Sequence, residues 1–389
     1  MSFMKRLGRL ATGAALGLVV AAGSAHAQSD TVNIGWTGPL SGGAALYGKQ
    51  TLDGVRMAVD EINSEGGLEV GGKKYKLNIV ALDDKYSPAE AAVNARRLSQ
   101  EQKSPIVFVP HFGGTAALQA FNESMNFIIL AHTSVPSVTE RGNKLTVRTP
   151  PPFSIYMEPF SKITMERYGK RLGIAAGNHD YAKAWLALAV PAWKELGGEI
   201  VAENLMDYTK DADYYSGVSR VLAAKPDVLF VGGPSEPTAL VIKQARELGF
   251  KGGFITMDQP KFDEMAAVLG GYELMEGAVG TTPLQFYGSD ATESFVERYM
   301  KIHKEAPGAE AGLNYFATHM LAEAMRRAGS VTDAMAIRAK IGEALETLPS
   351  KYNLYEINKI DEGGALTGIL TVATVKDGKV VPIQATMLD

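Results

Sequence analysis

Our prediction of the fold starts from two short apolar runs, Ile106-Val107-Phe108-Val109 and Val228-Leu229-Phe230-Val231. Each run has the length of a strand that is buried on both faces. Each is followed by a glycine-containing loop and then by a stretch whose apolar residues have helical spacing. Two such units, one in each half of the chain, predict two lobes of similar architecture.

The same alternation extends outward from both runs. Ser87-Pro88-Ala89-Glu90 combines a serine cap, a first-turn proline and a glutamate, which is typical of a helix start. After Pro150-Pro151-Pro152, a break in composition, the alternation begins again. The predicted strands are 32–36, 75–82, 105–109, 127–130, 172–176, 200–204, 228–231 and 254–256, and the predicted helices are 48–63, 181–196, 216–224 and 238–248, with two more starting at Ser87 and near Thr115.

This alternation predicts an α/β fold in which each lobe is a mainly parallel sheet flanked by helices. A chain of 389 residues exceeds what one hydrophobic core usually supports, which also favours two domains. In open parallel sheets, ligands bind outside the carboxyl ends of the strands. Two such lobes that face each other would therefore form a ligand cleft.

The first 27 residues have the three parts of a signal peptide. Lys5, Arg6 and Arg9 give a positive start, residues 10–22 are mainly apolar, and Ala25-His26-Ala27 places small residues at the cleavage site. The apolar run is too short to span a membrane. We therefore expect cleavage before Gln28, export to the periplasm and a soluble mature protein.

Charge and cysteine content narrow the function further. Loss of the signal peptide removes three positive residues and no acidic ones, so the formal net charge changes from −4 to −7. An acidic chain without a block of Lys and Arg is a poor candidate for nucleic acid, whose binding depends on neutralised phosphates. The sequence has no cysteine, so stability has to come from burial rather than from disulfides.

The sequence offers only weak signs of an enzyme. Residues 43–50 differ from a P-loop by Gln50, which stands where a Ser or Thr would hold magnesium. Ser235 lies in an incomplete nucleophile elbow that lacks the last glycine. His179, His303 and His319 do not have metal-ligand spacing. We therefore expect no catalytic residues, no metal and no cofactor.

A set of motifs resembles the type I periplasmic binding proteins, specifically the branched-chain amino-acid (Leu/Ile/Val) receptor family of ABC transporters. The resemblance runs from about Thr31 to the C-terminus. It lies in the order and spacing of these motifs: Gly38-Pro39-Leu40-Ser41-Gly42, Tyr47-Gly48, Ala58-Val59-Asp60-Glu61-Ile62-Asn63, Gly66-Gly67, Asp83-Asp84, Thr139-Glu140-Arg141-Gly142 and Arg148-Thr149.

The resemblance implies a chain that crosses between its lobes three times, here near Pro150, Ala278 and Tyr352. The first lobe would comprise 28–149 and 279–351, and the second 150–278 and 352–389. It also implies a monomer whose lobes close on a small molecule, an amino acid or a related carboxylate. The closed form would then dock onto the permease subunits of an ABC transporter in the inner membrane.

The resemblance also implies a set of ligand-binding residues. The carboxylate of an amino acid would be held by the first lobe, through Gly113, Gly114, Thr115, Thr133 and Ser134. Free N–H groups at a helix N-terminus are suited to this anion. The ammonium would be held by Asp258 of the second lobe, since a carboxylate is its natural partner. Tyr47 and Tyr181 would enclose the apolar part.

Alternatives remain at several of these positions. Thr115 could cap its helix, Thr133 and Ser134 could stabilise a turn, and Asp258 could be a solvated acid. His111 could donate to a carboxylate or pack beside Phe112.

Two loops depart from the family pattern. His111-Phe112-Gly113-Gly114-Thr115 replaces a serine-rich run, and Gly232-Gly233-Pro234-Ser235 lacks the usual aromatic residue. These departures leave open an amine-free solute, such as an aromatic or keto acid, an amide or a urea-like molecule. A periplasmic sensor that is read by a receptor is a further alternative.

Overall fold

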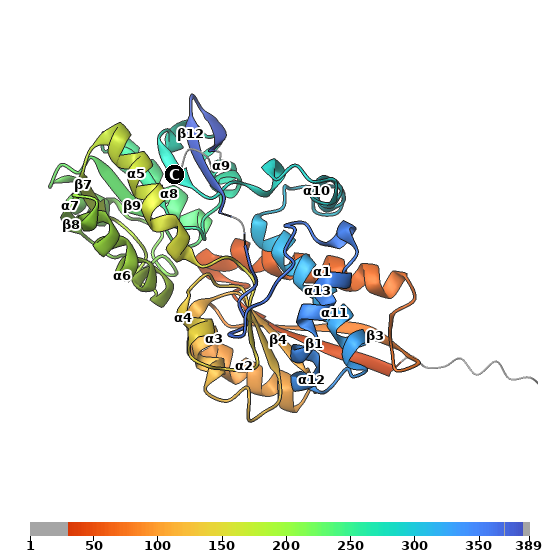
Figure 1. Cartoon of the computed structure of the whole chain (residues 1–389). Coiled ribbons are helices and arrows are strands. Elements are labelled where there is room, and N and C mark those ends of the chain that lie inside the picture. Colours follow the sequence, from red (N-terminus) through yellow and green to blue (C-terminus); the bar gives the residue numbers. More distant parts are fainter. Residues whose placement is uncertain (1–29, 369, 384–389) are drawn as a thin grey trace, which may run out of the picture.

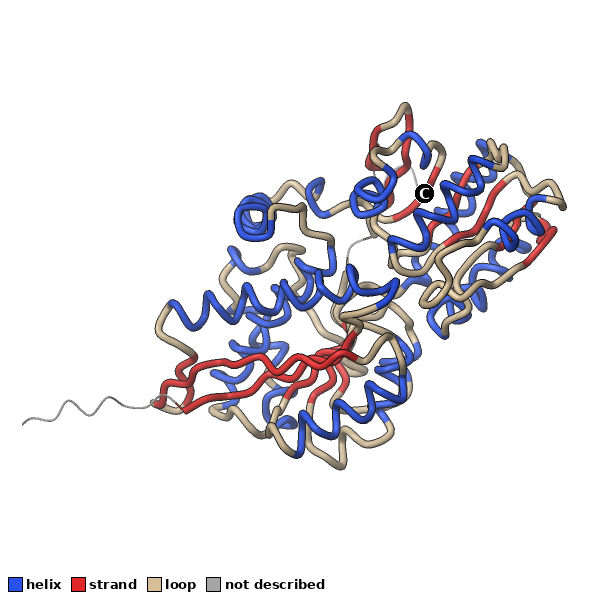
Figure 2. The backbone as a smooth tube through the Cα atoms, turned by 180° about the vertical axis from the view of Figure 1, so that it is seen from behind, coloured by secondary structure: helices blue, strands red, loops and turns tan. Residues whose placement is uncertain are grey.

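The computed structural model describes residues 30–368 and 370–383, which form two α/β lobes (Figure 1). The predicted signal peptide lies outside the described residues. Each lobe contains one mainly parallel sheet with helices on both faces (Figure 2). The predicted fold class is therefore confirmed.

The sheet of the first lobe has the order β2-β3-β1-β4-β5-β6, and only β2 runs antiparallel to its neighbour. Its strands are β1 (Asp30–Gly38), β2 (Leu68–Val70), β3 (Lys73–Asp83), β4 (Ile106–Val109), β5 (Ile128–Ala131) and β6 (Thr146–Arg148). The first apolar run is thus β4, a central strand, and all four of its residues are buried.

Alternate residues of β4 pack into two different cores. Ile106 and Phe108 join the core beneath α1 (Ala45–Ser64) and α11 (Ala309–Ala328). Val107 and Val109 join the core beneath α2 (Pro88–Gln100) and α3 (Phe112–Gln119). Because successive side chains of a strand point to opposite faces, a strand covered on both sides has to be apolar throughout.

The sheet of the second lobe has the order β13-β12-β11-β10-β9-β7-β8, with β12 and β13 antiparallel at one edge. Its strands are β7 (Arg171–Ile174), β8 (Glu199–Glu203), β9 (Val228–Val231), β10 (Gly253–Thr256), β11 (Ala278–Gly280), β12 (Val372–Lys376) and β13 (Lys379–Ile383). The second apolar run is β9, and its side chains also alternate between two cores.

Helices cover both faces of this second sheet. One core contains residues of α5 (Met157–Tyr168) and α6 (Asp180–Glu195). The other contains residues of α7 (Tyr215–Leu222), α8 (Ser235–Glu247) and α9 (Phe262–Leu269). The remaining elements are α4 (Ser137–Glu140), α10 (Asp290–His303), α12 (Ala334–Ala339), α13 (Ile341–Thr347), and the 3-10 turns η1 (Gly42–Ala44), η2 (Phe153–Tyr156), η3 (Glu273–Met275), η4 (Leu284–Phe286) and η5 (Ser350–Tyr352).

The chain passes between the sheets three times. It leaves the first sheet after β6, returns after β11 and enters the second sheet again at β12. The last passage comes later than Tyr352, where we expected it. Leu354, Ile357 and Leu366 belong to the core of the first lobe, and Ala365 pairs with Arg148 beside β6. The chain therefore stays with the first lobe until these apolar side chains are buried.

Helix boundaries follow the local capping signals. The serine predicted to cap a helix does so, because Ser87 Oγ accepts a hydrogen bond from Glu90 N (3.4 Å). The start predicted near Thr115 is wrong: α3 begins at Phe112. Within the described residues, we find no helix that has both the length and the apolar character needed to cross a membrane.

Close packing of α1 against α11 makes Gly54 a sensitive position. A Cβ atom added there would lie 2.0 Å from the carbonyl oxygen of Ala311. We therefore predict that Gly54→Ala lowers the free energy of unfolding by about 1–3 kcal/mol, because overpacking forces the two helices apart. Urea denaturation followed by circular dichroism measures this change.

Gly342→Ala, in α13, is the matched control. The nearest atom to its added Cβ, Ile360 Cγ2, is 4.0 Å away. This variant should be unchanged or more stable by up to about 1 kcal/mol, since Ala favours helix over Gly. Equal stability of the two variants would contradict the proposed packing constraint.

Candidate ligand-binding site

A cavity lies between the two lobes at the carboxyl ends of their strands. Residues 110–112 follow β4, 132–134 follow β5, 258–261 follow β10, and 281–282 follow β11. The space within the cavity, including the part open to solvent, is about 800 Å³. Its polar lining includes Tyr47, Tyr86, His111, His132, Thr133, Ser134, Tyr156, Tyr181, Asp258, Gln259, Lys261, Thr281, Thr282 and Glu310.

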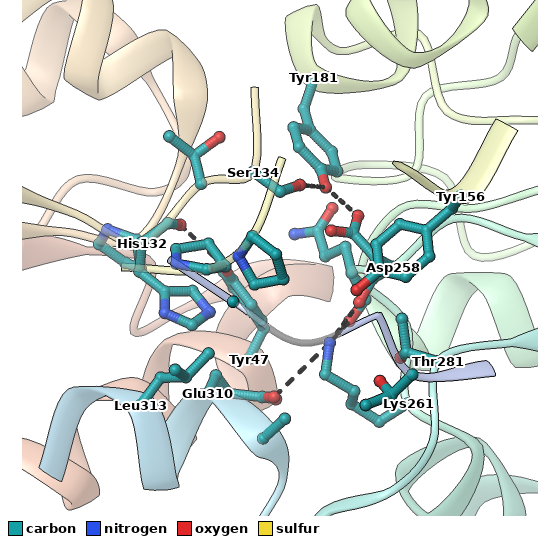
Figure 3. A pocket seen from close by; sticks show the side chains of 18 of the residues that line it. Tyr47, His132, Ser134, Tyr156, Tyr181, Asp258, Lys261, Thr281, Glu310 and Leu313 are labelled. Atoms are coloured by element: carbon teal, nitrogen blue, oxygen red, sulfur yellow. Dashed lines mark hydrogen bonds and ion pairs between the residues drawn. The ribbon is translucent and has the colours of Figure 1, made fainter. Parts of the chain in front are cut away.

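Three predicted site residues form a chain of hydrogen bonds across the cleft (Figure 3). Tyr181 donates its hydroxyl proton to Asp258 Oδ1, and the Oγ of Ser134 lies 2.7 Å from the same hydroxyl. Because the proton of Tyr181 is directed to Asp258, Ser134 has to be the donor to Tyr181. A serine of the first lobe is thereby connected to an acid of the second.

The local environment keeps the Tyr181 hydroxyl protonated. Burial and the nearby Asp258 carboxylate raise the pKa of Tyr181 well above its usual value. The tyrosine therefore remains a neutral donor at physiological pH. Trp185 Nε1 also approaches both partners, at 3.0 Å from Asp258 Oδ1 and 3.1 Å from the Tyr181 hydroxyl. These donors fix the orientation of the Asp258 carboxylate.

Two other predicted residues line the cavity. Thr133 is 4% exposed, and its Oγ1 has no hydrogen-bond partner among the described residues. Its hydroxyl is therefore free to bind a ligand. Tyr47 is buried, and its hydroxyl donates to the carbonyl oxygen of His132 at 3.3 Å. The Tyr47 ring thus forms a fixed wall.

The structure does not place Gly113, Gly114 or Thr115 in the cavity wall. The N–H groups that we expected to hold a carboxylate are bonded within the protein: Gly114 N donates to His111 Nδ1 (3.0 Å) and Thr115 N to His111 O (3.0 Å). The Thr115 hydroxyl also donates to His111 O. Gly113 instead lies close to Pro88 and to Asp180 of the other lobe.

His111 explains this difference, because its imidazole is the cap of α3. Its Nδ1 accepts a hydrogen bond, so Nε2 carries the proton and donates to Asp84 Oδ2 at 2.9 Å. Thr37 also donates to this carboxylate, and the Tyr86 ring stacks on the imidazole with centroids 4.9 Å apart. His111 therefore acts as a buried cap, and both of its nitrogens are already bonded.

Sequence reasoning missed Lys261 and Glu310, which face each other from different lobes (Figure 3). Lys261 Nζ lies 3.8 Å from Glu310 Oε2 and donates to the carbonyl oxygens of Asp258 and Gln259. Glu310 lies in the first turn of α11, where acidic residues are common for helix-dipole reasons alone. The sequence around it therefore carries no distinctive signal of a binding role.

His132 is a neutral part of the cavity wall. Burial, together with the nearby Lys261 charge, lowers its pKa to about 3. Its Nδ1 lies 3.2 Å from Asn314 Nδ2 and 3.3 Å from Thr149 Oγ1. Since the amide nitrogen of Asn314 can only donate, Nδ1 is the unprotonated acceptor.

The geometry also tests the enzyme-like signals. The P-loop-like segment is closely packed: a Cβ atom at Gly48 would lie 1.6 Å from the carbonyl oxygen of Pro39, and Gln50 Oε1 accepts from Tyr299 OH and Gly308 N. No group of three or more His, Cys, Asp or Glu with the geometry of a metal site occurs in residues 30–368 and 370–383.

Two α/β lobes with a polar cleft between them define a solute-binding protein of the two-lobed type. The family model described as periplasmic binding protein matches residues 31–379. The chain therefore belongs to the periplasmic binding protein family. This membership confirms the resemblance found in the sequence, and it confirms a binding protein rather than an enzyme.

Named relatives agree over most of their length. An amino acid binding protein of Pseudomonas aeruginosa is 26% identical over 364 residues, with 90% of this chain and 91% of the relative covered. The Leu/Ile/Val-binding protein of Escherichia coli K12 is 25% identical, covering 78% of this chain and 82% of its own length.

Solved structures share the fold. A branched-chain amino acid transporter substrate binding protein from Streptococcus pneumoniae, in complex with isoleucine, has a TM-score of 0.75 at 23% identity and covers 91% of this chain and all of its own. A solute binding protein from Rhodopseudomonas palustris, in complex with benzoate, has a TM-score of 0.77 at 16% identity and covers 91% and 95%.

The neutral state of His132 predicts a pH effect on stability. Because the folded pKa lies below the unfolded value of about 6.5, the unfolded chain binds a proton that the folded chain does not. The His132 contribution is fully present above pH 7 and is lost as the pH falls. Relative to His132→Gln, the wild type should lose up to about 1.4 kcal/mol per pH unit between pH 6 and 4.

Urea denaturation of both proteins across this pH range provides the measurement. A difference in stability that stays constant from pH 7 to pH 4 would show that His132 is not held neutral.

Proposed function

We propose that this chain captures a small amino acid in the periplasm by lobe closure and delivers it to the permease of an ABC uptake transporter. The observation that carries this proposal is the Asp258 carboxylate in the cleft. Tyr181 and Trp185 both donate to its Oδ1, whereas its Oδ2 makes no hydrogen bond to another described residue. An oriented carboxylate with one open oxygen is suited to a ligand ammonium.

The first lobe supplies the partner for the opposite charge of the ligand. Thr133, whose hydroxyl is free, and the neighbouring Ser134 belong to the first lobe and line the same cavity as Asp258. The Thr133 hydroxyl would hold the ligand carboxylate, and Ser134 would join it by exchanging its hydrogen bond to Tyr181 for one to the ligand. The Tyr47 and Tyr181 rings would enclose the remainder of the ligand.

This division of contacts explains why binding would close the lobes. The ammonium site belongs to the second lobe and the carboxylate site to the first, so one zwitterion reaches both only when the cleft is shut. A ligand shifts a conformational equilibrium by its differential affinity for the two states. Closure would then be a hinge motion of the three connecting segments.

Export and delivery complete the proposal. Residues 1–27 would direct the chain to the periplasm, the compartment implied by its family, and be removed before Gln28. The mature protein would act as a monomer, and its closed form would be the one that the permease recognises. The amino-acid-binding relatives support this reading over an amine-free solute.

Asp258→Asn tests the ammonium site. Loss of the negative charge should weaken binding of the preferred amino acid by at least about 2 kcal/mol, or roughly 30-fold in Kd, as expected when a buried charged partner is removed. Isothermal titration calorimetry on protein stripped of co-purified ligand measures this change.

Asp211→Asn is the matched control, because Asp211 is an exposed acid of the same lobe outside the cavity wall. It should bind as the wild type does. If Asp258→Asn also binds as tightly as the wild type, Asp258 does not hold an ammonium and an amine-free ligand becomes the better interpretation.

A further inference from the structure

A second carboxyl group faces the cavity at some distance along the wall from the Ser134–Tyr181–Asp258 chain. Glu310 is fully buried, and apart from the neighbouring Glu264 carboxyl group its oxygens have no hydrogen-bond partner among the described residues. It lines the cavity beside Leu313, one turn further along α11 (Figure 3). None of the roles proposed above uses this side chain.

Lys261 balances the charge of Glu310 without satisfying its oxygens. The 3.8 Å between Lys261 Nζ and Glu310 Oε2 exceeds hydrogen-bond distance. The ammonium of Lys261 instead donates to the carbonyl oxygens of Asp258 and Gln259. Burying a carboxylate is costly unless it is both paired and hydrogen-bonded.

Nearby hydroxyl groups are committed to other partners. Tyr355 donates to the carbonyl oxygen of Ala309 (2.8 Å), and Tyr287 bonds to Thr371 (3.1 Å). Tyr47 donates to His132 O. None of these tyrosines therefore donates a hydrogen bond to Glu310.

Glu264 is a second buried acid close to Glu310. Burial, followed by the Glu310 charge and a hydrogen bond with Glu310, raises the pKa of Glu264 well above its usual value, and Glu264 Oε2 accepts from Ser235 at 2.5 Å. A protonated Glu264 donates to one oxygen of Glu310. The other oxygen is left to accept a hydrogen bond from a ligand in the cavity.

We infer that Glu310 is a specificity-determining residue, which accepts a hydrogen bond from a donor group on the ligand side chain. The preferred ligand is then an amino acid whose side chain carries an amide, hydroxyl or ammonium, rather than leucine, isoleucine or valine. The inference rests on the proposed function, which assigns the contacts of the ligand's ammonium and carboxylate, and it adds the contact of the ligand's side chain.

The physical basis of the discrimination is an unpaired acceptor. An aliphatic ligand side chain would place methyl groups against Glu310, and methyl groups supply no hydrogen-bond donor to its oxygen. Sites built to hydrogen-bond a ligand reject the analogue that lacks the polar group by large factors. Two further unpartnered atoms of the cavity wall, Gln259 Oε1 and Thr281 Oγ1, make the surroundings equally unsuited to an aliphatic group.

Matched pairs of ligands provide the test. Asparagine and leucine have nearly the same shape but differ in the amide, and lysine and norleucine differ in the terminal ammonium. Titration calorimetry on the stripped protein should show that at least one polar member binds at least tenfold more tightly than its aliphatic partner. A wild type that prefers the aliphatic member of both pairs overturns the inference.

Two variants assign the preference to Glu310. In Glu310→Leu, the polar-to-aliphatic ratio should fall at least tenfold, while leucine binds as well as before or better, which also shows that the variant is folded. Glu310→Gln should keep a preference for asparagine but lose any preference for lysine. An unchanged ratio in both variants overturns the inference.

A third pair separates this inference from the proposed function. Succinamate and 4-methylpentanoate are asparagine and leucine without the α-amino group. A Glu310-dependent preference within this pair, with affinities equal to those of the amino acids, supports the role of Glu310 and overturns the ammonium site. Failure of all six compounds to bind the wild type overturns both proposals.

Discussion

The hydrogen bonds that connect Ser134, Tyr181 and Asp258 are the interaction on which the proposed function depends. They link the carboxyl end of β5 in the first lobe to α6 and the end of β10 in the second. Tyr181 is a donor to one partner and an acceptor from the other, so its position fixes both. Any change in the angle between the lobes has to break or remake this chain, which couples lobe closure to the chemistry of the cleft.

The sheets explain why these side chains meet at one place. Parallel strands put all their carboxyl ends on one edge, and two such edges face each other across the cleft. β4 and β9 are buried on both faces, so their position is set by packing and not by the ligand. This is also why the fold was predictable from the sequence: fully apolar four-residue runs, a serine cap and proline-rich breaks each reflect a local physical rule. The last crossing was not predictable, because residues 353–366 form no regular helix or strand and are held by burial and by isolated backbone bridges to distant residues.

The candidate site was predictable only in part. Tyr47, Thr133, Ser134, Tyr181 and Asp258 line the cavity, whereas Gly113, Gly114 and Thr115 do not. Their expected role assumed free helix amides, and the sequence did not reveal that His111 would accept from Gly114 N through its imidazole and from Thr115 N through its carbonyl oxygen. Lys261 and Glu310 were missed for a related reason. They are 49 positions apart in the sequence and come together only through packing of the lobes, so no local pattern marks them.

The central claim is that one ligand engages both lobes and thereby closes them. Small-angle X-ray scattering on the stripped protein, with and without a saturating amino acid, tests it most directly. The account predicts that the radius of gyration falls on binding and that the saturated scattering curve matches the closed arrangement with Ser134 and Tyr181 in contact. An unchanged radius of gyration at a ligand concentration where calorimetry shows full occupancy would contradict closure as the mechanism of capture.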